Sequence, residues 1–300
     1  MKTVAIVGLG TITKYYLKGI ADAPLLRLSA VCDIAEQAPS RPLFSAVPFY
    51  QDYKAMLQEV RPDYLVISTP PASHMEIATY ALENGTNVIV EKPATLCMED
   101  YDALIALARE KGLLFEVAFH WQNGSEVLEF NRLYDPAQIS EVTVCVLDPY
   151  SADGVVIDEQ KRKLMGAWVD SGINALSLLK MWLPFESVEV CSANAQLCPE
   201  SGLPVYADVQ LVIDGVPVRI TVDWRKGQNK KESFLTYQGR RIHLNHSGQC
   251  IVDGGKAVDC EHMERLQQHY YQYFTAFDGT ADVPAARKIH EVLFKVRDML

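Results

Sequence analysis

Several features that mark other classes of protein are missing from this 300-residue sequence. No apolar run reaches the length of a membrane-spanning helix, and Met1-Lys2 leads directly into an apolar segment, which leaves no room for a signal peptide. The 28 Lys and Arg residues are outnumbered by 38 Asp and Glu, which argues against nucleic acid or an anionic membrane as a partner. No internal repeat or low-complexity segment occurs. We therefore expect a cytoplasmic protein.

The seven cysteines are odd in number and scattered, and none of them forms a C-x-x-C pair. They are expected to be reduced thiols, mostly small core residues. The five histidines between residues 243 and 290 lack the spacing of metal ligands, and no metal site is predicted. With 49% hydrophobic residues, the chain can bury a large core in one big domain or two moderate ones.

The first thirty residues carry an ordered set of segments. Thr3–Val7 is a short β-branched run typical of a buried parallel strand. A glycine-containing turn, Gly8–Thr13, separates it from a helical pattern over Tyr15–Ala23. A second strand-like run, Leu28–Cys32, ends on Asp33. Strand, glycine turn, helix, strand and acid form the layout of a dinucleotide-binding unit.

Each part of this layout has a physical task. Gly8 permits a tight turn, and Gly10 lets the backbone approach a pyrophosphate at a helix N-terminus. The Asp33 carboxylate can accept hydrogen bonds from both ribose hydroxyls and would repel a 2′-phosphate, which favours NAD and leaves NADP as the alternative. Thr13 stands where a third small residue usually occurs, and an ordinary strand–helix turn ending in a solvated Asp remains the alternative interpretation. The cofactor-binding residues predicted here are Gly8, Gly10, Thr11, Ile12 and Asp33.

The alternation of strands and helices continues to residue 118. Helices are predicted over 53–60, 74–84 and 98–111, and strands over 64–68, 87–90 and 113–118. This order predicts an α/β fold with a doubly wound parallel Rossmann sheet. Two loops after its strands are expected to contact the cofactor. They supply Ser68, Thr69, Pro70 and His74, and then Glu91 and Lys92.

The pattern changes near Phe119. Beyond a helical stretch around 126–133, strands are predicted over 141–147, 187–196, 207–213, 216–224, 233–238, 240–244 and 250–252, with helices over 261–277 and 285–299. We expect residues 1–119 to form an NAD(P)-binding Rossmann domain. Residues 120–300 should form an α+β substrate domain with a large, mostly antiparallel sheet. One face of such a sheet must be covered, which predicts a homodimer or homotetramer.

Two groups of residues are candidates for the chemistry. Lys92 follows a buried strand and precedes a proline, so its ammonium could enter the crevice at the strand ends, although a surface lysine is the alternative. Asp170 and Asn174 lie four residues apart before an apolar run, and therefore on one helical face. Asp170 could instead be an ordinary N-cap.

These motifs, in this order, resemble the glucose–fructose oxidoreductase/inositol dehydrogenase (Gfo/Idh/MocA) family over essentially the whole chain. In that family a Lys of an E-K-P motif and the Asp and His of a D-x-x-x-H motif line the site of hydride transfer. Lys92 and Asp170 match these positions, whereas Asn174 replaces the His and cannot act as a base near neutral pH. The run from Asp170 to Ser177 resembles the branch of L-arabinose and D-galactose 1-dehydrogenases.

The resemblance implies oxidation of an aldose at C1 to a lactone, with NAD as hydride acceptor. Asp170, or neutral Lys92, would take the O1 proton, and Asn174 would orient the sugar. His120, Trp121 and Trp168 could form a sugar wall, with packing as the more conservative interpretation, and His74 is expected to shape the cofactor loop. Two alternatives stay open. One is an oxidoreductase acting on another sugar or inositol hydroxyl or on a keto-sugar, and the other is a sensor of NAD or sugar without turnover.

Overall fold

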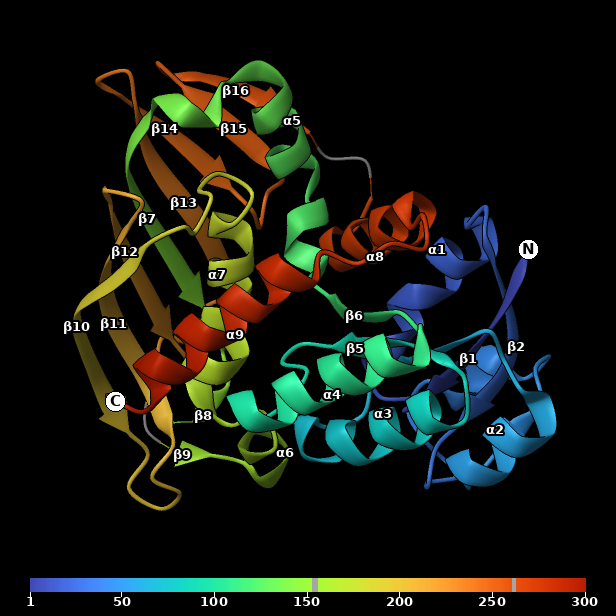
Figure 1. Ribbon diagram of the computed structural model, residues 1–300. Helices are drawn as coiled ribbons and strands as arrows, with labels where there is room; N and C mark the ends of the chain where they lie inside the picture. The colour runs from blue at the N-terminus through green and yellow to red at the C-terminus, as the bar shows by residue number, and fades with distance from the viewer. Residues whose placement is uncertain (153–155, 261–262) are drawn as a thin grey trace. The chain divides into compact units, whose positions relative to one another are not determined.

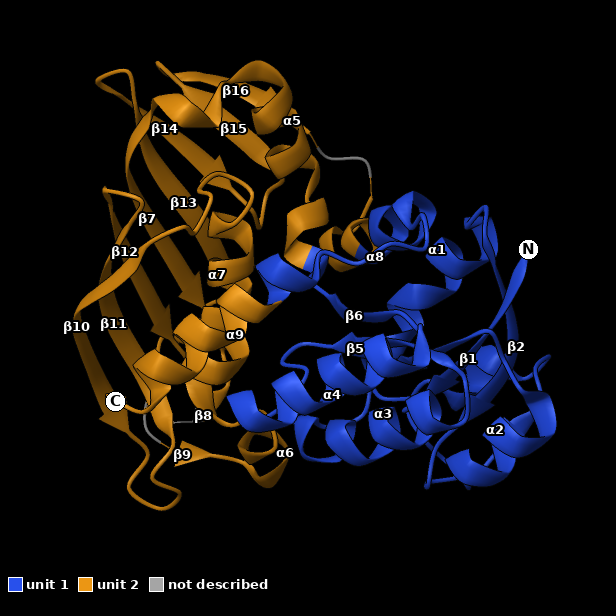
Figure 2. Cartoon of the chain, viewed as in Figure 1, with its two compact units in different colours: residues 1–120, 270–286 blue, residues 121–269, 287–300 orange. Residues whose placement is uncertain are grey.

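The computed structural model describes residues 1–152, 156–260 and 263–300 (Figure 1). The chain folds as two compact units, coloured separately in Figure 2. Unit 1 consists of Met1–His120 and Tyr270–Ala286, and unit 2 of Trp121–His269 and Arg287–Leu300. The boundary expected after residue 119 lies next to the first crossing, but residues 270–286 return to unit 1 because their aromatic side chains are part of its core.

A parallel sheet forms the centre of unit 1. Its six strands run in the order β3-β2-β1-β4-β5-β6, and every neighbouring pair is parallel. The predicted Rossmann sheet is confirmed. Apolar β-branched runs buried on both faces favour this arrangement. The strands are β1 (Lys2–Val7), β2 (Leu26–Cys32), β3 (Phe49–Tyr50), β4 (Tyr64–Ile67), β5 (Asn87–Glu91) and β6 (Phe115–Ala118).

The helices of unit 1 begin and end where local chemistry dictates. The Asp52 side chain accepts a hydrogen bond from the Lys54 backbone N–H at the start of α2. Gly112, with φ of 65°, ends α4 in the left-handed conformation that glycine tolerates. The helices are α1 (Tyr16–Asp22), α2 (Tyr53–Val60), α3 (His74–Glu83) and α4 (Met98–Lys111), with short turns η1 (Thr13–Tyr15), η2 (Arg41–Phe44) and η3 (Pro71–Ser73).

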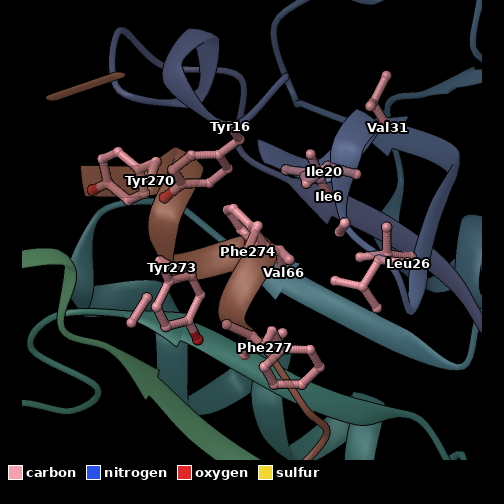
Figure 3. Close-up of a cluster of buried hydrophobic side chains, with 14 of the residues drawn as sticks. Ile6, Tyr16, Ile20, Leu26, Val31, Val66, Tyr270, Tyr273, Phe274 and Phe277 are labelled. Carbon is pink, nitrogen blue, oxygen red and sulfur yellow. The ribbon is translucent and has the colours of Figure 1, made fainter. Parts of the chain in front are cut away.

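Helix α8 spans Arg265–Ala276, and its residues from Tyr270 onward complete the core of unit 1. The Tyr16 ring lies 4.6 Å from that of Tyr270 and 5.3 Å from that of Phe274, measured between centroids. Figure 3 shows these rings gathered with Phe277 against strand residues such as Val66. Burial of such large aromatic surfaces is a main source of stability, so this helix is held to the sheet by its own side chains.

Unit 2 is built on an eight-stranded sheet in the order β10-β11-β12-β7-β13-β14-β15-β16. Its pairs are antiparallel except β7 and β12, which are parallel. The mostly antiparallel sheet is therefore as predicted. The strands are β7 (Ile139–Leu147), β10 (Val188–Leu197), β11 (Pro204–Ile213), β12 (Val216–Asp223), β13 (Lys230–Tyr237), β14 (Arg240–Asn245), β15 (Cys250–Asp253) and β16 (Lys256–Asp259).

Helices cover one face of this sheet. Helix α5 packs on β14 and β15, and a π-helical turn, η6, packs on β11 and β12. Along β11, buried residues alternate with more exposed ones, as expected for a sheet with one covered face. The helical segments of unit 2 are η4 (His120–Asn123), α5 (Ser125–Leu133), η5 (Pro136–Gln138), α6 (Glu159–Arg162), η6 (Trp168–Gly172), α7 (Ile173–Leu179) and most of α9 (Val283–Arg297).

Some elements were absent from the sequence prediction. They include the short strands β3, β8 (Ser151–Ala152), β9 (Val156–Ile157) and β16, the helix α6 and the turn η6. The helix predicted from residue 261 begins at Arg265, and residues 261–262 lie outside the described part of the chain. Among the described helices, none combines the length and apolar character needed to cross a bilayer.

Candidate functional site

The glycine turn after β1 leaves a space that a side chain would close. Gly8 has φ of +96°, and a Cβ atom there would lie 2.7 Å from the Ser68 carbonyl and the Thr69 nitrogen. Glycine is therefore required at this position. A Cβ atom on Gly10 would meet no atom within 4 Å. This open approach to the backbone is what a pyrophosphate group needs, so the turn fits the predicted cofactor.

Side chains from three other segments hold this turn. Thr13, fully buried, donates from Oγ1 to the Gly8 carbonyl at 3.0 Å. Ser68 at the end of β4 donates to the same carbonyl at 2.8 Å. Ser40 donates to the Gly10 carbonyl at 2.6 Å. Thr13 thus stands where the glycine fingerprint usually has a small residue, and its buried hydroxyl stabilises the turn through the hydrogen bond to Gly8.

Asp33 lies beside the turn, as its distance along the sequence predicts. Its Oδ2 accepts from the Leu9 backbone N–H at 2.7 Å and its Oδ1 from that of Ala35 at 2.8 Å. Each carboxylate oxygen keeps a second lone pair for a ribose hydroxyl. The two backbone donors fix the orientation of the carboxylate before any ligand binds.

His74 connects the loops after β4 and β5. The ring is buried, with Nδ1 2.9 Å from the Pro93 carbonyl oxygen and Nε2 2.8 Å from that of Thr69. Burial lowers the pKa of His74. Pro70 precedes the short turn that leads into α3. The expectation that His74 shapes the cofactor loop agrees with these contacts.

Glu91 ends β5 inside the protein. Its Oε1 accepts hydrogen bonds from the hydroxyls of Tyr16 and of Tyr270, the latter at 2.7 Å, and its Oε2 accepts from the Lys92 backbone N–H at 3.2 Å. Burial raises the pKa of Glu91, and the two tyrosine hydroxyls oppose that rise. The carboxyl thus links α1 and α8 to the end of β5, directly before Lys92, and a cis peptide bond follows between Lys92 and Pro93.

Asp170 and Asn174 lie on consecutive turns in unit 2. Asp170 is inside the π-helical turn η6, and the residue before α7 is Gly172, which makes no side-chain cap. Asp170 is therefore not a helix N-cap, and π-turns are frequent at functional sites. The Asn174 amide donates from Nδ2 to the Asp170 carbonyl at 3.2 Å, while its Oδ1 is buried and has no hydrogen-bond partner in the described part of the chain.

Trp168 supports this turn from inside the protein. It is fully buried, and its Nε1 donates to the Leu293 carbonyl at 2.9 Å. A Cβ atom on Gly172 would lie 2.7 Å from the Trp168 ring, so glycine lets the ring pack flat on the turn. The tryptophan therefore has a packing role in unit 2, and its ring is covered by protein.

Ser171 joins the turn to a buried ion pair. Its hydroxyl donates to Asp148 Oδ2 at 2.9 Å and accepts from Trp224 Nε1 at 3.2 Å. Asp148 Oδ1 lies 2.5 Å from Lys231 Nζ, which also donates to the Leu147 carbonyl at 3.1 Å. The chain of contacts fixes the backbone next to Asp170 to strands β7 and β13.

The same cluster contains two cations and a phenol. Burial lowers the pKa of Lys231, and the charges of Asp148 and Asp170 oppose the change. Burial also lowers the pKa of Arg265. Burial raises the pKa of Tyr150, with further contributions from Asp148 and Asp170. The carboxylate of Asp170 therefore lies in a strongly charged environment within unit 2.

The other two predicted wall residues are also buried. His120 is stacked on Tyr270 with centroids 4.8 Å apart, and the Trp121 ring is tilted against His246 at 5.8 Å. His246 Nδ1 lies in turn 2.7 Å from Glu126 Oε1. These contacts agree with the packing interpretation of both residues.

Sequence reasoning missed Asp148, Ser171, Lys231 and Arg265. Ser171 stood inside the motif, but a hydroxyl beside a candidate acid is common and gives no signal by itself. The other three come from distant segments, and Lys231 is 83 positions from Asp148. Among the described residues, no group of three or more His, Cys, Asp or Glu could hold a metal ion.

The Rossmann sheet and its glycine turn define the class as a dinucleotide-binding fold. Residues 2–119 match the model of a family described as an oxidoreductase family with an NAD-binding Rossmann fold. The match over this segment confirms the Gfo/Idh/MocA resemblance and the expectation of NAD as cofactor.

Individual relatives are distant and span much of the chain. The UDP-N-acetylglucosamine 3-dehydrogenase of Acidithiobacillus ferrooxidans is 21% identical over 97% of this chain and 95% of its own length. Its solved structure covers all of this chain and 97% of its own, with a TM-score of 0.82. The scyllo-inositol 2-dehydrogenase (NAD(+)) of Bacillus subtilis is 29% identical over 68% of this chain and 60% of its own. The D-galactose-1-dehydrogenase structure from Rhizobium etli has a TM-score of 0.79 at 24% identity. The match covers 99% of this chain and 94% of that structure's chain.

Proposed function

We propose that this protein is an NAD-dependent dehydrogenase that oxidises the C1 hydroxyl of an aldose to a lactone. The observation that carries the proposal is the pair formed by Asp170 in the π-turn η6 and Asn174 in the following helix α7. Asn174 presents a buried Oδ1 without a hydrogen-bond partner among the described residues, next to a carboxylate in a charged environment. A buried unsatisfied acceptor favours a ligand that donates a hydrogen bond, and a sugar hydroxyl is such a donor.

The proposed mechanism gives each candidate residue a role. From unit 2, Asp170 takes the proton from O1, and Asn174 orients the sugar by accepting a hydroxyl hydrogen bond at Oδ1. Lys92 is the candidate cation for stabilising negative charge on the reacting oxygen, or an alternative proton acceptor when its amine is neutral. When bound, NAD supplies the acceptor for the C1 hydride.

Unit 1 contains the groups that would hold this cofactor. The open Gly10 backbone would face the pyrophosphate, and the oriented Asp33 carboxylate would accept from the ribose hydroxyls. Arg41, a cation that could favour NADP, lies with its guanidinium 4.3 Å from the centroid of the Phe49 ring. NAD is therefore the preferred acceptor in this proposal.

Oxidation at another carbon is the second candidate. The relatives named as a 3-dehydrogenase and as an inositol 2-dehydrogenase act at positions other than an anomeric carbon. The exchange of the family histidine for Asn174 favours C1, since an anomeric hydroxyl is more acidic than other sugar hydroxyls and needs a weaker base. A sensor without turnover remains the third candidate.

The test is nicotinamide reduction by purified protein with aldoses, polyols and inositols, and with NAD and NADP in separate assays. We expect turnover of an aldose with NAD and its loss in Asp170→Asn. Asp298→Asn, a change at an exposed surface carboxylate, is the matched control and should retain the wild-type rate. Oxidation of inositols alone would reject C1 chemistry, and tight NAD binding without turnover of any substrate would favour the sensor.

A further inference from the structure

Arg265, the first residue of α8, is a cation with an unused donor. Its Nη1 is buried and has no hydrogen-bond partner among the described residues. No ion pair to this guanidinium is present in the described part of the chain. A guanidinium has five N–H donors and stays protonated, so a buried unused donor indicates a missing acceptor.

The local structure does not favour a cation at this position. The N-terminus of a helix carries partial positive charge, which disfavours an arginine there. Burial acts in the same direction, and the charges of Asp148 and Glu126 offset it only in part. Because Nη1 has no hydrogen-bond partner among the described residues, a bound anion would supply the acceptor that this guanidinium lacks.

The neighbouring carboxylates are already engaged. Asp148 bonds Lys231 through Oδ1 and Ser171 through Oδ2. Glu126 bonds His246 through Oε1, and its buried Oε2 makes no hydrogen bond within the described residues, so it does not bond Arg265 either. Among the described residues, therefore, no carboxylate accepts a hydrogen bond from Arg265 Nη1.

Arg265 belongs to the charged cluster around Asp170. The charges of Asp148, Asp170 and Arg265 influence the pKa of the Tyr150 hydroxyl and also the pKa of the Lys231 ammonium. Lys231 is already paired with Asp148, whereas Arg265 keeps an Nη1 donor that no described residue uses. Arginine binds carboxylate and phosphate groups through two parallel hydrogen bonds.

We propose that Arg265 is a specificity residue that binds an anionic group of the substrate, so that the sugar oxidised by this protein carries a carboxylate or a phosphate. The inference rests on the proposed dehydrogenase function and narrows its substrate class. A carboxylate and a phosphate have in common a negatively charged oxygen group that can accept hydrogen bonds from the guanidinium.

The test compares sugars that differ in charge at a position away from C1. D-galactose is paired with D-galacturonate, and D-glucose with D-glucuronate and D-glucose 6-phosphate. We expect kcat/KM to favour one anionic class by about 10- to 100-fold, the range of a charge-assisted hydrogen bond. Arg265→Gln should abolish this preference mainly through KM, and Arg265→Lys should restore part of it. Arg241→Gln, at an exposed arginine of β14, is the matched control and should keep the preference.

Two further measurements separate this inference from the proposed function. Calorimetric titration of the NADH complex with the same sugars measures binding without turnover, and tighter binding of the anion that is lost in Arg265→Gln supports the proposal. The melting temperature of ligand-free Arg265→Gln should equal or exceed that of the wild type, because an unsatisfied charge is removed. Equal use of neutral and anionic sugars, or equal binding of both, overturns the anion site while the dehydrogenase remains. A fall in melting temperature also overturns it, since Arg265 would then stabilise Asp148 and Glu126.

Discussion

Glu116 on β6 gives unit 1 a stability that depends on pH. Its Oε1 accepts from the Tyr273 hydroxyl at 2.8 Å, while its Oε2 is buried and has no hydrogen-bond partner among the described residues. Burial, with a smaller contribution from Asp278, raises the pKa of Glu116 from 4.5 to about 7. The carboxyl is thus protonated in the folded protein at pH values where the unfolded chain carries the charge.

The sign of the effect follows from proton uptake. Between pH 4.5 and about 7 the folded state holds more protons than the unfolded state, so the free energy of unfolding falls as pH rises. The contribution is fully present below pH 4.5 and is lost by about pH 7, and the shift corresponds to about 3 kcal/mol. Glu116→Gln keeps an acceptor for Tyr273 and carries no charge at any pH. We expect the variant to be more stable than the wild type at pH 8, by up to about 3 kcal/mol, with no advantage at pH 4.5.

The assay is urea unfolding at several pH values from 4.5 to 8, with amide hydrogen exchange of β6 as a probe of unit 1. All four tryptophans lie in unit 2, so their fluorescence reports that unit separately and should not respond to the substitution. Glu110→Gln, at an exposed glutamate of α4, is the control and should not change the pH dependence. A stability difference between Glu116→Gln and wild type that stays constant from pH 4.5 to 8, or that reverses in sign, would refute the reasoning.

Two further predictions concern the turns that form the site. Gly8→Ala should lower the free energy of unfolding by about 2–4 kcal/mol, from its positive φ and the contact with Ser68. Gly10→Ala should change it by less than about 0.5 kcal/mol yet weaken NAD binding, which thermal melting and NAD titration would measure together; equal stability losses would contradict the assignment of Gly10. Ser171→Ala removes the hydroxyl that donates to Asp148 Oδ2, while Lys231 still bonds Oδ1. The loss should cost about 1–3 kcal/mol and lower kcat more than it raises KM, and an unchanged kcat in steady-state kinetics would show that this contact does not position Asp170.

The sequence by itself determined most of unit 1. The helices Tyr53–Val60 and Met98–Lys111 begin and end where they were predicted, because a capping Asp52 and a glycine such as Gly112 act within a few residues. The glycine turn and Asp33 could also be found from spacing, since a strand, a turn and a helix in immediate succession leave little freedom in how they pack.

The tertiary structure decided the rest. Asp170 looked equally suited to an N-cap, and its place in a π-turn depends on Trp168 packing on Gly172 and on Ser171 bonding Asp148. The unused donor of Arg265 is equally invisible in the sequence. Such features arise from contacts between residues far apart in the chain, where neither periodicity nor local capping carries information, and only the packed fold determines which charges are satisfied.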